Sequence, residues 1–310
     1  MPRLSGLSFV ALALFSAACR PSQPSAAPSA AAPPARTEKS SLDPAPEVET
    51  PAPEQPDAGT QAIAAESGEP PAQQPAQQPA QKTPELACRM TGEERFVYGI
   101  GSSSMGSLLG PMLGRQIRER FAEVTFRKWG KSASGLARPD FHDWIAEVPS
   151  INSDYDPDVY VVSIGTNDAQ PLYSRRYKWV RMDDPRWEEL YAERIDTILD
   201  LMAGEDRRRR IIWIGPNAFP KANSRKIGPT IDRLLRERLA AFDGDAHYIA
   251  LYDATSPSPG EYIETVALAG SKKPQRAWTE DGIHLSRFAV RALMIDPALE
   301  LLDACFAPAS

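Results

Sequence analysis

From residue 96 onward, hydrophobic and polar positions alternate in two kinds of block. Short apolar runs rich in β-branched residues, such as 159–164, are bounded by turn residues and are typical of strands buried on both faces. Longer blocks carry apolar residues at helical spacing, as in 108–121. The pattern predicts strands at 96–100, 124–126, 159–164, 211–214 and 248–251, and helices at 108–121, 141–148, 187–202, 231–242 and 286–302, the last with Ser286 as its N-cap.

This alternation predicts an α/β fold: a three-layer α/β/α sandwich in which helices cover both faces of a five-stranded parallel sheet. Two longer polar connections, 173–185 and 255–276, are expected to be insertions or lids. In such folds ligands bind beyond the carboxyl ends of the strands, so chemistry is expected just after each strand.

The N-terminal third differs in composition. Residues 20–86 are dominated by Pro, Ala, Gln, Glu and Ser. Such a stretch buries too little apolar surface to offset its ordering entropy, so a disordered linker is expected. Residues 87–310 are then expected to form one domain of ordinary size.

Residues 1–19 are typical of a secretory signal. Arg3 precedes a short apolar run, 4–15, and the segment ends Ser16-Ala17-Ala18-Cys19. This ending resembles a bacterial lipobox, which implies that Cys19 is lipidated and becomes the mature N-terminus. The alternative is an ordinary signal peptide cut near Ala18. The expected location is the cell envelope, with the chain lipid-anchored to a bacterial membrane and facing the periplasm or the exterior.

The two remaining cysteines, Cys88 and Cys305, bracket the predicted domain and are expected to form a disulfide in an oxidising compartment. No Cys/His cluster has zinc-ligand spacing, so neither a metal nor a cofactor is expected. The net charge of −6 gives no reason to expect a nucleic-acid partner. The basic run 207–210 is interpreted as a solvated loop before a strand.

Residues with candidate catalytic roles come after three of the predicted strands. Three serines, Ser102, Ser103 and Ser104, come after the first, where a helix N-terminus offers free N–H groups to an oxyanion. Gly135 follows the second strand and can present its N–H to a reacting atom. Asn167 follows the third and can donate from its side-chain amide. Singly, each pattern is more often an N-cap or a turn.

Asp281 and His284 lie three residues apart before the last predicted helix. A turn at this spacing can bring the carboxylate onto the imidazole, where it would fix the tautomer while the other nitrogen faces a serine. The other two histidines lack such neighbours. His142 is interpreted as a helix-surface residue, and His247 as the start of a strand.

In this order the motifs resemble the four blocks of the SGNH/GDSL hydrolase family. The resemblance spans about 96–302 and is specific in Gly165-Thr166-Asn167-Asp168 and in Asp281-Gly282-Ile283-His284. The stretch 135–144 resembles a bacterial envelope lipoprotein branch of that family. The resemblance implies a flavodoxin-like sandwich with a five-stranded parallel sheet, in agreement with the alternation.

The resemblance also implies Ser104 as nucleophile, His284 as general base and Asp281 as its partner. The oxyanion hole would comprise the N–H groups of Ser104 and Gly135 and the side chain of Asn167. The family's first block normally reads Gly-Asp-Ser, whereas serines fill it here. The following Met and Pro favour Ser104, and Ser103 and Ser102 remain alternatives. The absence of a Gly-x-Ser-x-Gly elbow argues against the α/β-hydrolase family.

These observations predict a serine esterase that hydrolyses an O-acyl group on an envelope or extracellular carbohydrate through an acyl-serine. Two alternatives are an O-acyltransferase with the same triad and a degenerate hydrolase kept as a binding lipoprotein. The expected partners are an acylated small molecule or carbohydrate and, through the lipid anchor, a membrane. The chain is expected to be a monomer.

Overall fold

The computed structural model describes residues 95–121, 123–219, 221–271 and 273–306. The predicted signal peptide with Cys19, the linker 20–86 and Cys88 lie outside these residues. Cys305 is a buried residue near the end of the chain, and its bridge to Cys88 stays a prediction. Within the described part of the chain, no helix is both long and apolar enough to cross a bilayer.

Five parallel strands form the central sheet, in the order β2-β1-β3-β6-β7. This order is flavodoxin-like and confirms the predicted fold class. Their bounds are Arg95–Gly101 for β1, Val124–Gly130 for β2, Val159–Ser163 for β3, Arg210–Ile214 for β6 and Ala246–Ile249 for β7. Every residue of β3 and β6 is buried, as their unbroken apolar runs predict.

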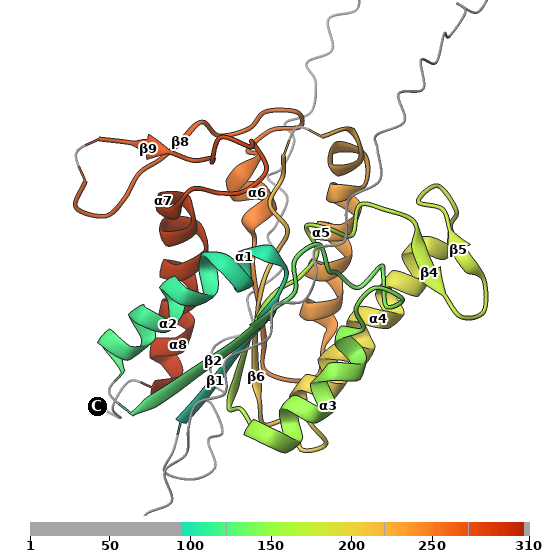
Figure 1. Ribbon diagram of the computed structural model, residues 1–310, viewed down its shortest axis with the longest axis horizontal. Coiled ribbons are helices and arrows are strands. Elements are labelled where there is room, and N and C mark those ends of the chain that lie inside the picture. The colour runs from blue at the N-terminus through green and yellow to red at the C-terminus, as the bar shows by residue number, and fades with distance from the viewer. Residues whose placement is uncertain (1–94, 122, 220, 272, 307–310) are drawn as a thin grey trace, which may run out of the picture. The chain divides into compact units, whose positions relative to one another are not determined.

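Helices cover both faces of the sheet, and each face has its own core (Figure 1). On one side lie α3 (Trp144–Tyr155), α4 (Arg186–Ala203) and α5 (Ala222–Ala241). On the other lie α2 (Leu109–Arg120) and a C-terminal segment made of α7 (Arg287–Val290), the π-helical turn η1 (Arg291–Ile295) and α8 (Asp296–Phe306). The Ser286 hydroxyl accepts from the N–H of Ala289, which confirms the predicted N-cap.

The structure starts α5 nine residues before the predicted helix at 231–242. Gly228 and Pro229 lie inside it, and both residue types normally interrupt helices. Ile227 and Ile231 are buried beside them, so packing against the sheet outweighs the local preference. This is why the sequence pattern placed the start too late.

Both long polar connections are insertions, as predicted. Residues 173–185 contain most of a hairpin of β4 (Leu172–Ser174) and β5 (Lys178–Val180). Residues 255–276 begin with the last residue of the short helix α6 (Leu251–Thr255) and contain the strand pair β8 (Thr265–Val266) and β9 (Gln275–Arg276). Figure 1 shows the two hairpins on opposite sides of α1 (Ser103–Ser107).

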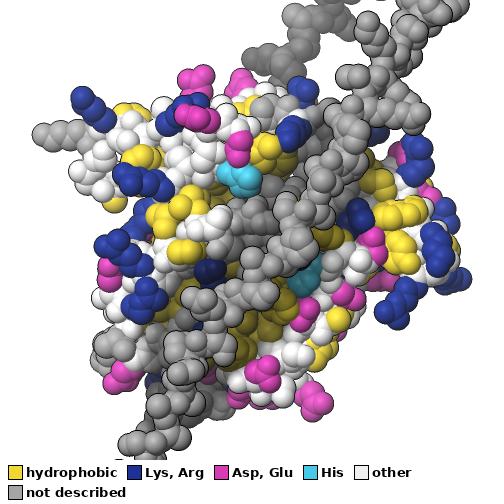
Figure 2. Space-filling view, in the orientation of Figure 1, with side chains coloured by type: hydrophobic (Ala, Val, Ile, Leu, Met, Phe, Trp, Pro, Cys, Tyr) yellow, Lys and Arg dark blue, Asp and Glu magenta, His cyan; other side chains and the backbone are white. Residues whose placement is uncertain are grey.

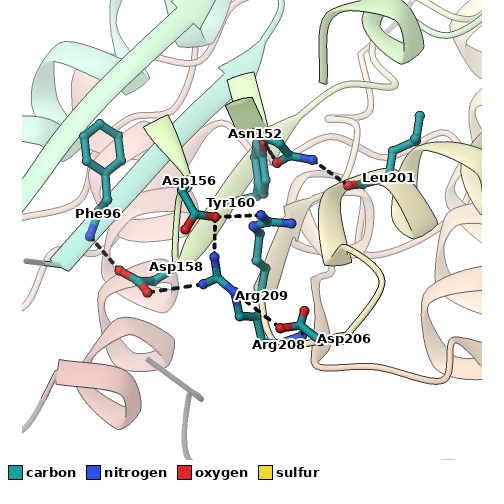
Figure 3. Close-up of polar contacts among 9 residues, drawn as sticks. All are labelled: Phe96, Asn152, Asp156, Asp158, Tyr160, Leu201, Asp206, Arg208 and Arg209. Atoms are coloured by element: carbon teal, nitrogen blue, oxygen red, sulfur yellow. Dashed lines mark hydrogen bonds and ion pairs between the residues drawn. The ribbon is translucent and has the colours of Figure 1, made fainter. Parts of the chain in front are cut away.

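The basic run 207–210 is not a solvated loop, and that interpretation is wrong. Arg209 and Arg210 are 9% and 2% exposed. Arg209 lies 2.7 Å from Asp156, and Arg210 lies 2.7 Å from Asp245 (Figure 3 shows the Asp156 cluster). Guanidinium groups buried at the amino ends of strands require carboxylate partners, and these ion pairs hold together the end of the sheet opposite the predicted site.

Candidate active site

The first site loop follows β1. Gly101 ends the strand, and a Cβ there would lie 2.6 Å from the carbonyl oxygen of Ser163, so only glycine fits this close approach to β3. Ser102 then donates its N–H to the same carbonyl. It is the N-cap residue of α1, and it is buried. Ser103 is the first residue of the helix, and this turn brings its side chain out of the sheet.

The hydroxyl of Ser103 lies 3.0 Å from Nε2 of His284. The structure therefore corrects the expectation that Ser104 faces the histidine. The reason is where β1 ends. Its last residue, Gly101, is the glycine of the Gly-x-Ser block. Ser102 then takes the place of the family's Asp, and Ser103 takes the place of its serine. Ser104 is one helical residue further on, rotated by about 100° around the axis of α1.

His284 is held by Asp281, as the spacing predicts. Nδ1 of the imidazole lies 2.6 Å from Oδ2 of Asp281. The other carboxylate oxygen accepts from the N–H groups of Ile283 and His284, at 2.8 and 2.9 Å, and from the hydroxyl of Thr279, at 2.7 Å. One oxygen therefore orders the loop and the other orients the imidazole.

This arrangement has an electrostatic consequence. The hydrogen bond from His284, followed by the donors on the backbone and on Thr279, holds the pKa of Asp281 far below its ordinary value. The carboxylate is thus ionised and able to stabilise an imidazolium. Gly282 provides the positive φ of +64° that the tight turn between Asp281 and His284 requires.

The second site loop is built around a buried carboxylate, Asp168. Its oxygens accept from the N–H groups of Leu136 and Ala137, at 3.1 and 2.8 Å, and from the Tyr191 hydroxyl at 2.8 Å. A Cβ at Gly135 would lie 2.0 Å from Asp168 Oδ1, so glycine is required there for close packing. Burial raises the pKa of Asp168.

Asn167 directly precedes Asp168 in the loop that follows β3. Its side-chain amide donates to the carbonyl of Ser134 at 3.1 Å, which uses one of its two amide hydrogens. Its own carbonyl accepts from the Gln170 amide at 2.6 Å. The structure thus brings Asn167 beside the loop of Gly135, the two residues that the resemblance places in an oxyanion hole.

Sequence reasoning missed Asn217, which links the loops. Its Oδ1 accepts from the Thr166 hydroxyl at 3.1 Å, and its Nδ2 donates to the carbonyl of Ile283 at 3.0 Å. It therefore connects the residue before Asn167 to the residue before His284. The signal was available, because Asn217 is a polar residue three positions beyond the end of β6.

The remaining histidines lie elsewhere. His142 precedes α3, half-buried, and contacts the ring of Trp144 edge-on with centroids 4.4 Å apart. Burial lowers the pKa of His142, and its interpretation as a helix-surface residue is wrong. His247 lies in β7, as predicted, and its Nε2 is 2.7 Å from Asp245. Within the described residues, no three His, Cys, Asp or Glu side chains are grouped to hold a metal ion.

A model of the family described as "Protein of unknown function (DUF459)" matches residues 96–296. The chain belongs to this family. The matched range of this DUF459 protein includes Ser103, Asn167, Asp281 and His284. DUF459 is known as an SGNH-like family, in line with the resemblance seen in the motifs. No curated protein matches the chain.

Several solved structures are distantly similar to this DUF459 chain. One is a member of the lipolytic protein G-D-S-L family from Veillonella parvula DSM 2008, with 14% identity and a TM-score of 0.42 over 67% of this chain and 97% of that one. Another is a family 3 carbohydrate esterase of Clostridium thermocellum, with 12% identity and a TM-score of 0.43 over 68% of this chain and 98% of that one.

Proposed function

We propose that this chain is a serine esterase that acts through an acyl-serine formed on Ser103. The observation that carries the proposal is the continuous hydrogen-bonded line from Ser103 Oγ through His284 to Asp281. A serine hydroxyl is a weak nucleophile until a neighbouring base takes its proton, and a base of this kind needs a third group to orient it. We assign these three roles to Ser103, His284 and Asp281.

The chemistry follows from the orientation of the imidazole. With Nδ1–H donating to Asp281, Nε2 is free to accept the proton of Ser103 as its oxygen attacks the ester carbonyl. His284 then gives that proton to the departing alkoxide, which leaves as an alcohol while the acyl group stays on Ser103. A water molecule, deprotonated by His284, then attacks the acyl carbon. The bond from that carbon to Ser103 Oγ breaks, His284 returns the proton to Ser103, and the acid leaves.

The developing oxyanion needs donors placed in advance. The N–H groups of Ser103 and Gly135 and the side-chain amide of Asn167 are assigned this role. Moving the nucleophile from Ser104 to Ser103 also moves the first of these donors by one residue. The hydrogen bond from Asn167 to the carbonyl of Ser134 fixes the amide relative to Gly135 and supports this assignment.

The ester is proposed to be an O-acyl group on an envelope or extracellular carbohydrate. The side chains of Asp281 and His284 are each 46% exposed, so the base lies at an open surface. Such a surface can receive an acyl group displayed on a large molecule. The proposed signal peptide and lipidation at Cys19 would place the enzyme in the cell envelope, the linker 20–86 would give it reach, and a Cys88–Cys305 bridge would suit an oxidising compartment.

Incubation of the purified full chain with p-nitrophenyl acetate and with a fluorophosphonate probe tests the proposal. The expected result is turnover of the ester and covalent labelling, with the adduct mapped to Ser103 by peptide mass spectrometry. A folded protein that neither turns over the ester nor takes up the probe would contradict esterase function and favour a binding module. Transfer of the acetyl group to an added sugar, in preference to water, would reassign the chain as an acyltransferase.

A further inference from the structure

The β4–β5 hairpin concentrates positive charge on one exposed feature of an acidic chain. Residues 175–181 read Arg-Arg-Tyr-Lys-Trp-Val-Arg and contain no acidic residue, whereas the whole chain carries a net charge of −6. Leu172 and Val180 turn inward and are buried, and the cationic side chains are exposed. Figure 2 shows hydrophobic side chains ringed by Lys and Arg over this hairpin.

Most of this charge is not neutralised within the protein. Arg181 lies 3.0 Å from Asp183. Among the described residues, Arg175, Arg176 and Lys178 have no carboxylate partner, and the guanidinium of Arg176 lies over the ring of Tyr177, 5.0 Å from its centroid. Three cations grouped on a short turn create a local attraction for anions despite the negative charge of the chain.

Aromatic rings stand between the cations. Trp179 is 52% exposed and Tyr177 is 37% exposed. The Trp179 ring is held against Tyr173, its partner across the hairpin, with centroids 5.3 Å apart, and the guanidinium of Arg138 lies 4.7 Å from its centroid. These contacts fix the ring and leave half of its surface for a ligand.

The turn itself is preorganised. The hydroxyl of Ser174 accepts from the N–H groups of Arg176 and Tyr177, at 3.3 and 3.5 Å. Lys178 adopts a left-handed conformation with φ of +62°, which closes the turn. Groups held in place before binding lose less entropy when a ligand arrives, so this hairpin is suited to recognition.

The base of the hairpin is bonded directly to the proposed oxyanion loop. The N–H of Tyr173 donates to the carbonyl of Ala137 at 2.9 Å. Arg194 of α4 donates to the carbonyl of Leu136 at 2.5 Å and also to that of Tyr173, so it clamps the two segments together. The base of the hairpin therefore lies beside the loop that contains Gly135.

A second connection leads to Asn167. Arg138, whose guanidinium lies over Trp179, donates to the Gln170 side chain at 3.4 Å. Gln170 in turn donates to the carbonyl of Asn167 at 2.6 Å. The exposed ring and the oxyanion donor thus belong to one chain of contacts.

We propose that the β4–β5 hairpin binds an anionic polysaccharide of the uronic-acid class and holds its acylated sugars at Ser103. Sugar carboxylates pair with Arg175, Arg176 and Lys178, and the C–H face of a sugar ring packs on Trp179. This inference deepens the proposed esterase function and rests on it. The aliphatic side chains of the hairpin, Leu172 and Val180, are buried, and its base is bonded to the loop of Gly135. These two observations favour a polymer substrate over an anionic membrane.

Binding is measured without turnover, so its result is separate from that of the esterase assay. The full chain carrying Ser103→Ala is run in native affinity electrophoresis through gels containing polygalacturonate or dextran. The Ser103→Ala chain is the parent, and two further variants are made in it. The hairpin pair is Arg175→Gln/Arg176→Gln, and the control pair is Arg115→Gln/Arg118→Gln, which changes two exposed arginines of α2. Polygalacturonate is expected to retard the parent strongly and dextran only weakly. The hairpin pair is expected to weaken binding by about tenfold and the control pair by less than about twofold.

Trp179→Ala separates packing from charge. At 1 M salt, where the Debye length falls to about 3 Å, the parent keeps the residual affinity contributed by the ring and the Trp179→Ala variant loses it. Turnover gives an independent measure: with chemically O-acetylated polygalacturonate, the hairpin pair in the active chain raises KM about tenfold, whereas the control pair on α2 changes KM by less than about twofold.

Three results would overturn the inference while leaving the esterase proposal standing. The first is hydrolysis of p-nitrophenyl acetate by a chain that polygalacturonate does not retard. The second is equal weakening by the hairpin and control pairs, which would show that general charge alone drives binding. The third is hairpin-dependent binding to phosphatidylglycerol vesicles without binding to polygalacturonate, which would make the hairpin a membrane contact.

Discussion

The Ser103 hydroxyl and Nε2 of His284 lie within hydrogen-bonding distance, 3.0 Å apart, although 181 residues separate them in the chain. Both residues lie at the carboxyl-end edge of the sheet: Ser103 begins the helix after β1, and His284 lies in the loop before α7. In a sheet of this order, that edge is where the doubly wound topology brings distant loops together. The contact depends on register, because only one of three consecutive serines faces the imidazole.

The first prediction separates Ser103 from Ser104. Ser103→Ala should abolish fluorophosphonate labelling and lower ester turnover by roughly 10⁵–10⁶-fold, since loss of a triad nucleophile removes the whole covalent route. Ser104→Ala is the matched control and should keep most of the activity. The mass of each intact variant after treatment with the probe shows whether the covalent adduct has formed. Labelling that survives in Ser103→Ala but not in Ser104→Ala would restore the nucleophile to position 104.

The second prediction concerns the two oxygens of Asp281. Asp281→Asn should lower kcat by roughly 10⁴-fold, because an amide cannot stabilise the imidazolium and can favour the wrong tautomer. Thr279→Val removes one of three donors to the other oxygen and should cost about tenfold or less. Steady-state kinetics on p-nitrophenyl acetate compares the variants. Equal losses would mean that the order of the loop, rather than the charge of the carboxylate, limits catalysis.

The sequence predicted the parts of the molecule that depend on local pattern. The strands follow from blocks of apolar residues, their parallel arrangement follows from the alternation with helices, and the Asp281–His284 pair follows from a spacing of three residues. The nucleophile depends on where β1 ends, and a boundary uncertain by one residue moves the assignment from Ser103 to Ser104. The packing of Asp168 under Gly135 joins residues 33 positions apart and leaves no local signal.

The third prediction concerns the oxyanion. Asn167→Ala should lower kcat by roughly 10²–10³-fold, the usual loss for one preorganised donor. KM should change little, because this hydrogen bond strengthens mainly in the transition state. A large rise in KM with kcat intact would instead assign Asn167 to substrate binding. Circular dichroism checks that the loop change leaves the fold intact.

The fourth prediction concerns Asn217 as a positioning residue. Asn217→Ala removes the bond from Thr166 and the bond to the carbonyl of Ile283, so the loops of Asn167 and His284 lose their link. We expect kcat to fall roughly tenfold while KM stays within about twofold. Asn217→Asp keeps the acceptor for Thr166 but loses the donor to Ile283, and should fall between alanine and the parent. Unchanged kcat in both variants would show that the two loops are positioned independently.

The last prediction uses the buried carboxylate of Asp168. Burial raises its pKa in the folded chain, while its three hydrogen-bond donors and the nearby Arg194 offset this only in part. A folded pKa above the unfolded value of about 3.9 means that its contribution to stability is full in acid and is lost as pH rises through the folded pKa. Asp168→Asn cannot titrate and presents an amide hydrogen to backbone N–H groups, so it should be less stable than the parent by about 1–3 kcal/mol at pH 4.

That difference in unfolding free energy should shrink as pH rises from 4 to 8, and urea denaturation at several pH values measures it. Asp183→Asn is the control, because its carboxylate is exposed and pairs with the exposed Arg181, so removing it should leave the urea midpoint nearly unchanged at every pH. A difference for Asp168→Asn that grows with pH would have the opposite meaning. The hydrogen bonds from Leu136, Ala137 and Tyr191 would then outweigh burial, and Asp168 would stabilise the oxyanion loop as an anion.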